Sequence, residues 1–317
     1  MRERITSQLR DPRLFQLAVL GSLLGYGALA LDFEVEPRLC GVIAATALAT
    51  QLGIARVSGL AFDARSALVS ALSLCLLLRT TSATTAALAA AIAIGSKLLI
   101  RYRGKHLLNP TAFGLAAVLL LRDDAWVSAG QWGSAPVLAA FVACLGSLVI
   151  RRAERSDVTW AFLVTTAALL LGRALWLGDP MAIPLHALES GALLIFAFFM
   201  VSDPRTTPDS RAARIAFAGL VAMLGFVIRY GLYETNGLIW ALVLCAPLVP
   251  LLDRVLPGRR FEWGGRHGPG APIQGGRHDD AQADPAEPGE PGEPGEHGEP
   301  AEPADLGPVL PGLGTAA

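Results

Sequence analysis

The sequence lacks the short motifs that mark soluble enzymes. It contains no P-loop, no G-x-G-x-x-G, no H-E-x-x-H and no G-x-S-x-G nucleophile elbow. Its four cysteines fall singly in four apolar segments and form no C-x-x-C, so no iron–sulfur or zinc site is expected from local sequence. Buried thiols that pack as small apolar groups are the simpler interpretation.

Histidine is also scarce. Of the five histidines, three lie in the C-terminal tail, and only His106 and His186 lie among the apolar segments. A haem held by two histidines needs both at matching depth, whereas these two are predicted on opposite faces of a membrane, so haem is not expected. The formal net charge of -1 gives no reason to expect binding to nucleic acid.

Long apolar runs dominate what is present. The chain has 317 residues, 53% of them hydrophobic, and its mean hydropathy is +0.47. A transmembrane helix needs about 20 mostly apolar residues. The sequence therefore predicts an all-α polytopic membrane protein with ten transmembrane helices, at 14–31, 39–55, 66–78, 83–100, 107–121, 135–150, 158–177, 185–201, 212–228 and 236–252.

The first apolar segment, residues 14–31, has two interpretations. The small residues Ala28 and Ala30 could mark a signal-peptide cleavage site. However, the run is longer than the apolar core of a signal peptide, about 7–15 residues, and nine further segments follow. We therefore expect this segment to be retained as a transmembrane helix.

Basic residues are distributed unevenly between successive connectors. With the N-terminus inside, the outside connectors carry one arginine each, and the inside connectors carry most of the remaining Lys and Arg. This bias follows the positive-inside rule. It predicts a protein of the cell (inner, cytoplasmic) membrane with both termini cytoplasmic. The outside arginines are Arg38, Arg79, Arg122, Arg173 and Arg229.

The ten segments divide into halves of five, residues 14–121 and 135–252, within a membrane domain of residues 14–256. An odd number of helices in each half reverses its orientation, as in inverted-repeat membrane proteins, whose binding sites are often lined by broken helices. Residues 1–13 are expected to be a cytoplasmic N-terminus. Residues 257–317, rich in Pro, Gly and Glu, are expected to form a disordered cytoplasmic tail.

One broken segment begins at Asn109-Pro110. Asn is a favoured N-cap and Pro a favoured first helical residue, so a short helix is predicted from Pro110. Its free N–H groups would face Lys105 and His106, an arrangement suited to an anion such as a phosphate. The alternative is an ordinary capped helix entered from a basic loop.

A second polar stretch, MVSDPRTTPDSRAAR, covers residues 200–214 on the same predicted side. Thr207 is expected to cap a helix that begins at Pro208. The stretch is either a connector or part of a binding site. Among the few ionisable residues inside apolar segments, Glu189 is a functional candidate, whereas Lys97 is expected to extend to the membrane interface.

These stretches resemble the RnfD/NqrB family, membrane subunits of ion-translocating, flavin-containing electron-transport complexes. The resemblance implies ten helices in an inverted repeat. The matching residues are Asn109, Pro110, Phe113 and Gly114 in GKHLLNPTAFG, and Gly191, Phe199, Met200, Ser202, Asp203, Pro204 and Thr206 in HALESGALLIFAFFMVSDPRTTP. The resulting candidate cofactor-binding residues are Lys105, His106, Asn109, Thr111, Phe113, Gly114, Glu189, Gly191, Ser202, Asp203, Thr206 and Thr207.

The chain departs from that family at the flavin attachment site. The family's Ser-Gly-Ala-Thr motif is absent between residues 115 and 200, and the nearest analogue, Thr81-Ser82-Ala83-Thr84, lacks the glycine. We therefore expect FMN or riboflavin to be held without a covalent bond rather than attached at Thr84. The TTPDSRAAR continuation is most similar to the short branch often called UnbU, associated with enediyne antibiotic gene clusters in actinobacteria.

Three functions follow as hypotheses. The first is a membrane electron-transport subunit that holds a flavin and serves enediyne-type biosynthesis, with the lipid bilayer and other electron-transport subunits or a biosynthetic enzyme as partners. The second is a small-solute or ion channel or transporter on the same inverted-repeat fold, with Glu189 in the pore. The third is a membrane scaffold for a biosynthetic pathway.

Overall fold

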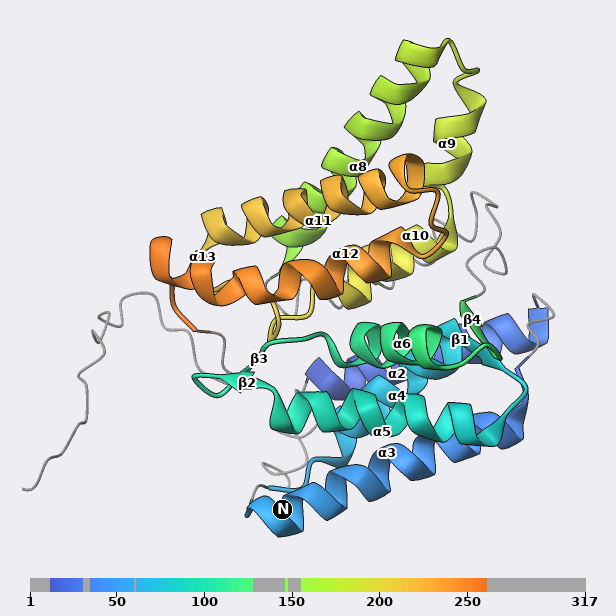
Figure 1. Ribbon diagram of the computed structural model, residues 1–317, viewed down its shortest axis with the longest axis vertical. Coiled ribbons are helices and arrows are strands. Elements are labelled where there is room, and N and C mark those ends of the chain that lie inside the picture. Colours follow the sequence, from blue (N-terminus) through green and yellow to red (C-terminus); the bar gives the residue numbers. More distant parts are fainter. Residues whose placement is uncertain (1–11, 31–34, 60, 128–145, 148–154, 261–317) are drawn as a thin grey trace, which may run out of the picture. The chain divides into compact units, whose positions relative to one another are not determined.

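The computed structural model describes residues 12–30, 35–59, 61–127, 146–147 and 155–260, and this part of the chain is mostly helical (Figure 1). The α-helices are α2 (Pro12–Ala30), α3 (Pro37–Ser58), α4 (Ala64–Leu77), α5 (Ala83–Leu99), α6 (Pro110–Leu121), α8 (Ser156–Leu177), α9 (Ala182–Leu188), α10 (Gly191–Ile195), α11 (Arg211–Gly231), α12 (Gly237–Cys245) and α13 (Val249–Val255). A π-helix, η2 (Phe196–Met200), continues α10, and a 3-10 turn, η3 (Ala246–Leu248), joins α12 to α13.

Two short antiparallel strand pairs lie between helices, which the all-helical prediction did not include. Strands β1 (Leu78–Thr80) and β4 (Ala125–Val127) pair with Arg79 opposite Trp126. Strands β2 (Arg101–Tyr102) and β3 (Lys105–His106) form a small hairpin directly before α6. The hairpin turns through Arg103 and Gly104, both at positive φ. It fixes the direction from which the chain enters α6.

Nine of the ten predicted segments coincide with helices of the structure, and the tenth, residues 135–150, lies almost wholly outside the described residues. Segment 185–201 is divided into α9, α10 and η2, and segment 236–252 into α12, η3 and α13. The expectations for the N-terminus before Pro12 and for the tail beyond Arg260 also fall outside the described residues.

Within the described residues, five helices are long and apolar enough to cross a membrane, and α9 with α10 and η2 makes a sixth if a bend of 44° is counted within one span. The apolar helices α4, α5 and α6 are shorter. At 1.5 Å per residue, the 12 residues of α6 reach about 18 Å, which is less than the hydrocarbon core of about 30 Å. Ten crossings, the inverted repeat and the orientation stay predictions.

Helix α6 begins where the sequence predicts. The Asn109 carboxamide oxygen accepts the N–H of Ala112 at 3.0 Å, and Pro110 is the first helical residue. The helix then packs closely against α5 (Figure 1). A Cβ atom on Gly114 would lie 2.7 Å from the carbonyl oxygen of Ala89 and 2.9 Å from Cβ of Ala93. Gly114 therefore allows the two backbones to approach each other.

The bent segment around η2 has an unusual hydrogen-bond pattern. The N–H of Val201 donates to the carbonyl of Phe196, five residues back, at 3.0 Å. The Thr159 hydroxyl of α8 donates to the carbonyl of Ala197 at 3.1 Å, and the Ser202 hydroxyl donates to that of Phe198 at 2.6 Å. Side chains thus supply donors to carbonyls in this wide turn, and π-helical turns are frequent at functional sites.

The helix predicted from Pro208 begins later than expected. Its first residue is Arg211, and the Ser210 hydroxyl caps it by accepting the N–H of Ala213 at 3.2 Å. Thr207 is not the cap, because its hydroxyl accepts a hydrogen bond from Arg155 instead. The prediction of a helix start at Thr207 was therefore wrong by three residues, since a long-range contact recruits the expected cap.

Replacement of Gly114 by alanine should destabilise the protein although alanine is the better helix former. The added methyl group would press on the backbone of α5, and such overpacking costs about 1–3 kcal/mol. The matched control is Gly172→Ala in α8, where a Cβ meets no atom within 4 Å. We expect the thermal unfolding midpoint in detergent to fall for the first variant and to stay or rise for the control. Equal midpoints would contradict the close approach.

Candidate functional site: a polar cavity beside the Asn-Pro turn

The two stretches that carry the family resemblance, the Asn-Pro turn and the residues around the end of η2, meet through the side chain of Asn109. While its oxygen caps α6, its amide nitrogen donates to the carbonyl of Met200 at 3.2 Å. Asn109 is 6% exposed and Met200 is 3% exposed. The Asn-Pro turn and the end of η2, far apart in sequence, are therefore joined by one buried hydrogen bond.

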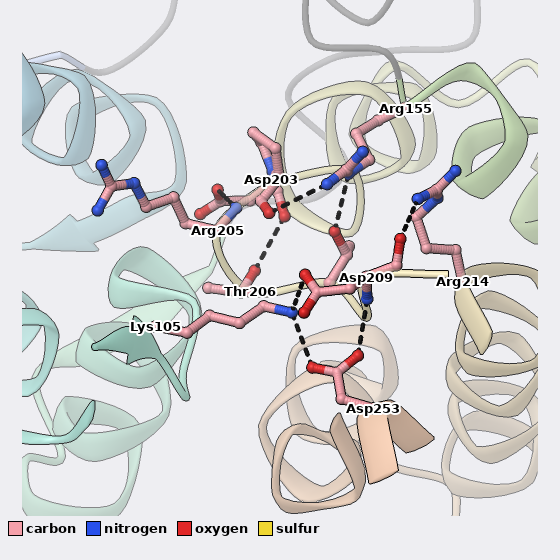
Figure 2. Close-up of polar contacts among 10 residues, drawn as sticks. Lys105, Arg155, Asp203, Arg205, Thr206, Asp209, Arg214 and Asp253 are labelled. Atoms are coloured by element: carbon pink, nitrogen blue, oxygen red, sulfur yellow. Dashed lines mark hydrogen bonds and ion pairs between the residues drawn. The ribbon is translucent and has the colours of Figure 1, made fainter. Parts of the chain in front are cut away.

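An ion-pair cluster ties the hairpin before α6 to the C-terminal half (Figure 2). The Lys105 ammonium lies 2.9 Å from a carboxylate oxygen of Asp209 and 2.9 Å from one of Asp253. The other oxygen of Asp253 accepts the N–H of Asp209 at 2.7 Å. Lys105 therefore compensates two acids and is not among the residues that line the cavity described below, contrary to the arrangement expected around the α6 N-terminus.

Two arginines hold the turn that follows η2, as Figure 2 shows. Arg155, 4% exposed, donates through Nε to the Thr207 hydroxyl at 3.1 Å and through Nη2 to the carbonyl of Pro204 at 3.4 Å. Arg214 donates through Nη1 to the carbonyl of Asp209 at 2.7 Å and pairs with Asp157 of α8 at 2.6 Å. Burial, and secondarily the charge of Arg214, lowers the pKa of Arg155 to about 10, so it stays charged at neutral pH.

A polar cavity of about 310 Å³ opens beside this turn. Its walls come from α2 to α5, from the start of α6 and from the turn after η2. Four of the predicted site residues line it, namely His106, Asn109, Thr111 and Asp203. The other polar lining residues are Arg13, Gln16, Gln51, Asp63, Ser66, Ser70, Ser73, Lys97, Arg101 and Arg205.

The cavity wall contains two buried polar atoms without a hydrogen-bond partner among the described residues, Oε1 of Gln51 and Nδ1 of His106. Gln51 is 3% exposed and His106 is 5% exposed. An unsatisfied buried polar group costs about 1–3 kcal/mol. A ligand that completes these hydrogen bonds would therefore be favoured at this place.

His106 is neutral at physiological pH. Burial, and after it the charges of Lys97, Arg205 and Arg101, lowers its pKa to about 3, although a hydrogen bond to the Lys97 backbone acts in the opposite direction. A neutral imidazole carries one N–H donor and one acceptor nitrogen. His106 can therefore accept a hydrogen bond in the cavity while the charge there is supplied by its neighbours.

Asp203 provides the acidic group opposite these cations. Burial raises its pKa, whereas the N–H of Arg205, donating to a carboxylate oxygen at 3.0 Å, and the charges of Lys97 and Arg205 act in the other direction. Arg13 and Asp63 form an ion pair at the cavity wall. The remaining lining charges, three basic and one acidic, give the cavity a positive balance.

Lys97 corrects one sequence-based interpretation. It was expected to extend to the membrane interface, but it is 6% exposed and its ammonium donates to the carbonyl of Ser66 at 2.9 Å and to the Ser66 hydroxyl. The side chain points into the protein because α4 offers it oxygen partners. Lys97 and Gln51, polar residues within otherwise apolar segments, are among the site residues that sequence reasoning missed, as are Arg101 and Arg205.

Other predicted residues lie near the cavity without lining it. Thr206 donates to the carbonyl of Asp203 at 3.3 Å, and Ser202 and Thr207 are occupied by the bonds already described. They shape the turn that presents Asp203. Phe113 and Gly114 do not line the cavity either, and Gly114 packs against α5.

Glu189 and Gly191 are not brought to the polar cavity. They flank the break between α9 and α10, where Glu189 is half-buried and Gly191 is buried. The pore role considered for Glu189 thus gains no support from the described residues. Thr84 is exposed near the start of α5, with its hydroxyl 2.6 Å from that of Ser82. Within the described residues, no group of three or more His, Cys, Asp or Glu could hold a metal ion.

Removal of the Lys105 charge should destabilise the protein by about 2 kcal/mol, between the values of exposed and buried ion pairs. Lys105→Met would leave Asp209 and Asp253 facing each other. The control is Asp179→Asn, which removes the more exposed Arg173–Asp179 pair and should change stability by less than about 1 kcal/mol. Chemical unfolding in detergent measures both. Similar losses in the two variants would contradict the importance of the cluster.

The buried His106 should make stability depend on pH. Its pKa is about 3 in the folded protein against 6.5 ordinarily, so the unfolded chain binds a proton that the folded chain does not over this range. Stability should then fall as the pH is lowered from about 6.5 toward 3, by up to about 1.4 kcal/mol per pH unit.

The His106→Gln variant removes this titration and keeps a polar side chain. We expect its unfolding midpoint, followed from pH 7 to about 4, to vary less steeply than that of the native chain. Other titrating groups, including Asp203, are common to both proteins and cancel in the comparison. Parallel pH profiles would contradict a neutral buried His106.

Part of the chain is similar in sequence to known proteins. Residues 123–262 match the family model of the NQR2, RnfD, RnfE family, and this range includes the Ser202–Thr207 turn but not Asn109. The D-type subunit of the ion-translocating oxidoreductase complex of Tolumonas auensis is 37% identical over 80 residues, which are 25% of this chain and 23% of the relative. The same kind of protein from Escherichia coli O1:K1 is 32% identical over 130 residues, 41% of this chain and 32% of the relative.

The matches thus span between about a quarter and a third of the relatives' own length. The long apolar helices among the described residues agree with a multi-pass membrane protein. Over residues 123–262, the chain carries the sequence pattern of the NQR2, RnfD, RnfE family of membrane proteins.

Proposed function

We propose that the chain is an integral membrane subunit of an electron-transport system and that its polar cavity holds a flavin, FMN or riboflavin, without a covalent bond. The observation that carries the proposal is the pair of unsatisfied buried atoms, on Gln51 and His106, in the wall of a cavity with a positive charge balance. The similarity to D-type subunits of ion-translocating oxidoreductase complexes supports the electron-transport role.

The chemistry of the wall suits a flavin ring. The ring offers an N–H donor between two carbonyl acceptors, and neutral His106 offers an acceptor nitrogen while Gln51 offers an amide. A reduced flavin or a flavin phosphate carries negative charge, which Lys97, Arg101 and Arg205 would stabilise. The volume of about 310 Å³ lies at the lower end of small-molecule sites. A flavin supplies electron transfer, and the protein supplies its position and electrostatic setting.

The membrane arrangement proposed for this function has ten crossings and both termini in the cytoplasm. Contacts between predicted connectors of the same side support it. The inside connectors meet in the Lys105–Asp253 and Asp157–Arg214 ion pairs and in the hydrogen bond from Arg254 to the Tyr102 hydroxyl at 2.8 Å. Two outside connectors meet where β1 pairs with β4. Basic loops would then lie on the side that the positive-inside rule requires.

The partners of this subunit are further membrane electron-transport proteins in our proposal, because the similar proteins are subunits of a complex. The polar network around Arg155 keeps the turn after η2 rigid and leaves Arg205 half-buried at the cavity. A role in enediyne biosynthesis stays a prediction, which rests on the resemblance of residues 206–214 to the UnbU branch.

Purification of the full-length protein in detergent, with and without added riboflavin or FMN, tests the flavin proposal. We expect visible flavin absorbance that is released on denaturation, since no covalent bond is involved. His106→Leu removes the acceptor and should weaken binding at least tenfold, equivalent to about 1.4 kcal/mol.

Two variants serve as controls. His106→Gln keeps an acceptor and should retain most of the affinity, and Thr84→Ala should bind as the native chain does. Flavin that stays with the chain after denaturation and disappears in Thr84→Ala would show covalent attachment instead. Absence of bound flavin under every condition, including co-expression with electron-transport subunits, would overturn the proposal.

A further inference from the structure

A second cavity, of about 390 Å³, lies at the opposite ends of α4 and α5 from the polar cavity and is lined by two cysteines. Cys40 comes from the first turn of α3 and Cys75 from the last turn of α4. Sequence spacing gave no sign of this pairing, because 34 residues separate the two positions. The packing of α3 on α4 brings them together.

The two cysteine side chains are neighbours at this cavity and differ in exposure. Neither is part of a disulfide. Cys40 is half-buried at the cavity, whereas Cys75 is 4% exposed. Cys40 is therefore the more accessible thiol, whereas Cys75, although it lines the cavity, offers little surface to a reagent.

A buried cation accompanies the pair. Arg79 is 6% exposed, lines the same cavity and donates through Nη1 to the carbonyl of Cys75 at 2.9 Å and to that of Leu78 at 2.8 Å. The guanidinium is thus fixed at the end of α4, in the wall of the cavity that the two cysteines also line. Cysteines next to Arg or Lys in a partly open setting are typically the reactive ones, because the thiolate is the nucleophile.

We propose that Cys40 and Cys75 form a redox-active dithiol that exchanges with small disulfide compounds through this cavity. The Cys40 sulfur, as thiolate, attacks one sulfur of the compound, whose S–S bond breaks, and the departing thiolate takes up the proton that Cys40 lost. The Cys75 sulfur then attacks Cys40, and the second thiol leaves with the Cys75 proton. The pair loses two electrons and two protons, and the compound gains both.

The geometry permits this second step with a small movement. A disulfide requires sulfur atoms about 2.05 Å apart, which is closer than a hydrogen-bonded contact. Cys40 borders the open volume, so its side chain has room to rotate toward Cys75. In the proposed orientation β1 and β4 lie on the outer face, where disulfides form and persist.

The test uses the full-length reduced protein in detergent, treated with oxidised glutathione, denatured, alkylated and analysed by peptide mass spectrometry. We expect a Cys40–Cys75 cross-linked peptide with the loss of two hydrogen atoms, and recovery of both alkylated cysteines after reduction. In Cys75→Ser the reaction should stop at a glutathione adduct on Cys40. In Cys40→Ser, Cys75 should stay free because it is shielded.

Cys245→Ser is the matched control, since Cys245 is equally buried in α12 and does not line this cavity. In the Cys245→Ser variant the Cys40–Cys75 cross-link should form as in the native chain. The proposal would be overturned if both cysteines are alkylated equally with and without oxidised glutathione. It would also be overturned if the native chain accumulates the Cys40 adduct with no cross-link, since Cys75 would then be unable to resolve it.

Discussion

The arrangement of the described chain depends on the carboxamide of Asn109. A helix that begins in an apolar setting has N–H groups that need acceptors, and the wide turn of η2 has carbonyls that need donors. Asn109 meets both needs at once, because its oxygen caps α6 and its nitrogen donates to Met200. An aspartate could cap the helix but could not donate, and an alanine could do neither. The polar cavity exists beside this junction because the two turns are held together there.

Charges around the junction fall into two groups with different roles. Lys105, Arg155 and Arg214 are matched by carboxylates, a hydroxyl or carbonyls, so they fasten connectors to one another (Figure 2). In contrast, the cavity wall has more basic than acidic groups and includes polar atoms without partners among the described residues. Structural charges in proteins are generally compensated, whereas imbalance in a cleft is more typical of a binding site. The compensated charges therefore have a structural role, whereas the unbalanced charges of the cavity wall belong to the candidate binding site.

Local sequence predicted the elements whose causes are local. Hydrophobic runs located nine helical segments among the described residues, and Asn109-Pro110 located the start of α6, because capping depends on neighbours in the chain. Features that depend on distant residues were missed or misread. Thr207 binds Arg155 instead of capping a helix, Lys97 turns inward to Ser66, and Cys40 meets Cys75. No periodicity in a single sequence encodes which helix will lie opposite such side chains.

The π-helix η2 determines how the residues that follow it are oriented. Residues in an α-helix advance by about 100° each, and the wider turn from Phe196 to Met200 absorbs one residue more than an α-helical turn would. The residues after Met200 are therefore rotated about the helix axis by about 100° relative to the apolar side chains of α10. The direction in which Asp203 points is therefore set by a single inserted position. Deletion of one residue from the Phe-Ala-Phe-Phe-Met run would leave the sequence of the following turn unchanged. It would nevertheless direct the Asp203 carboxylate away from the cavity.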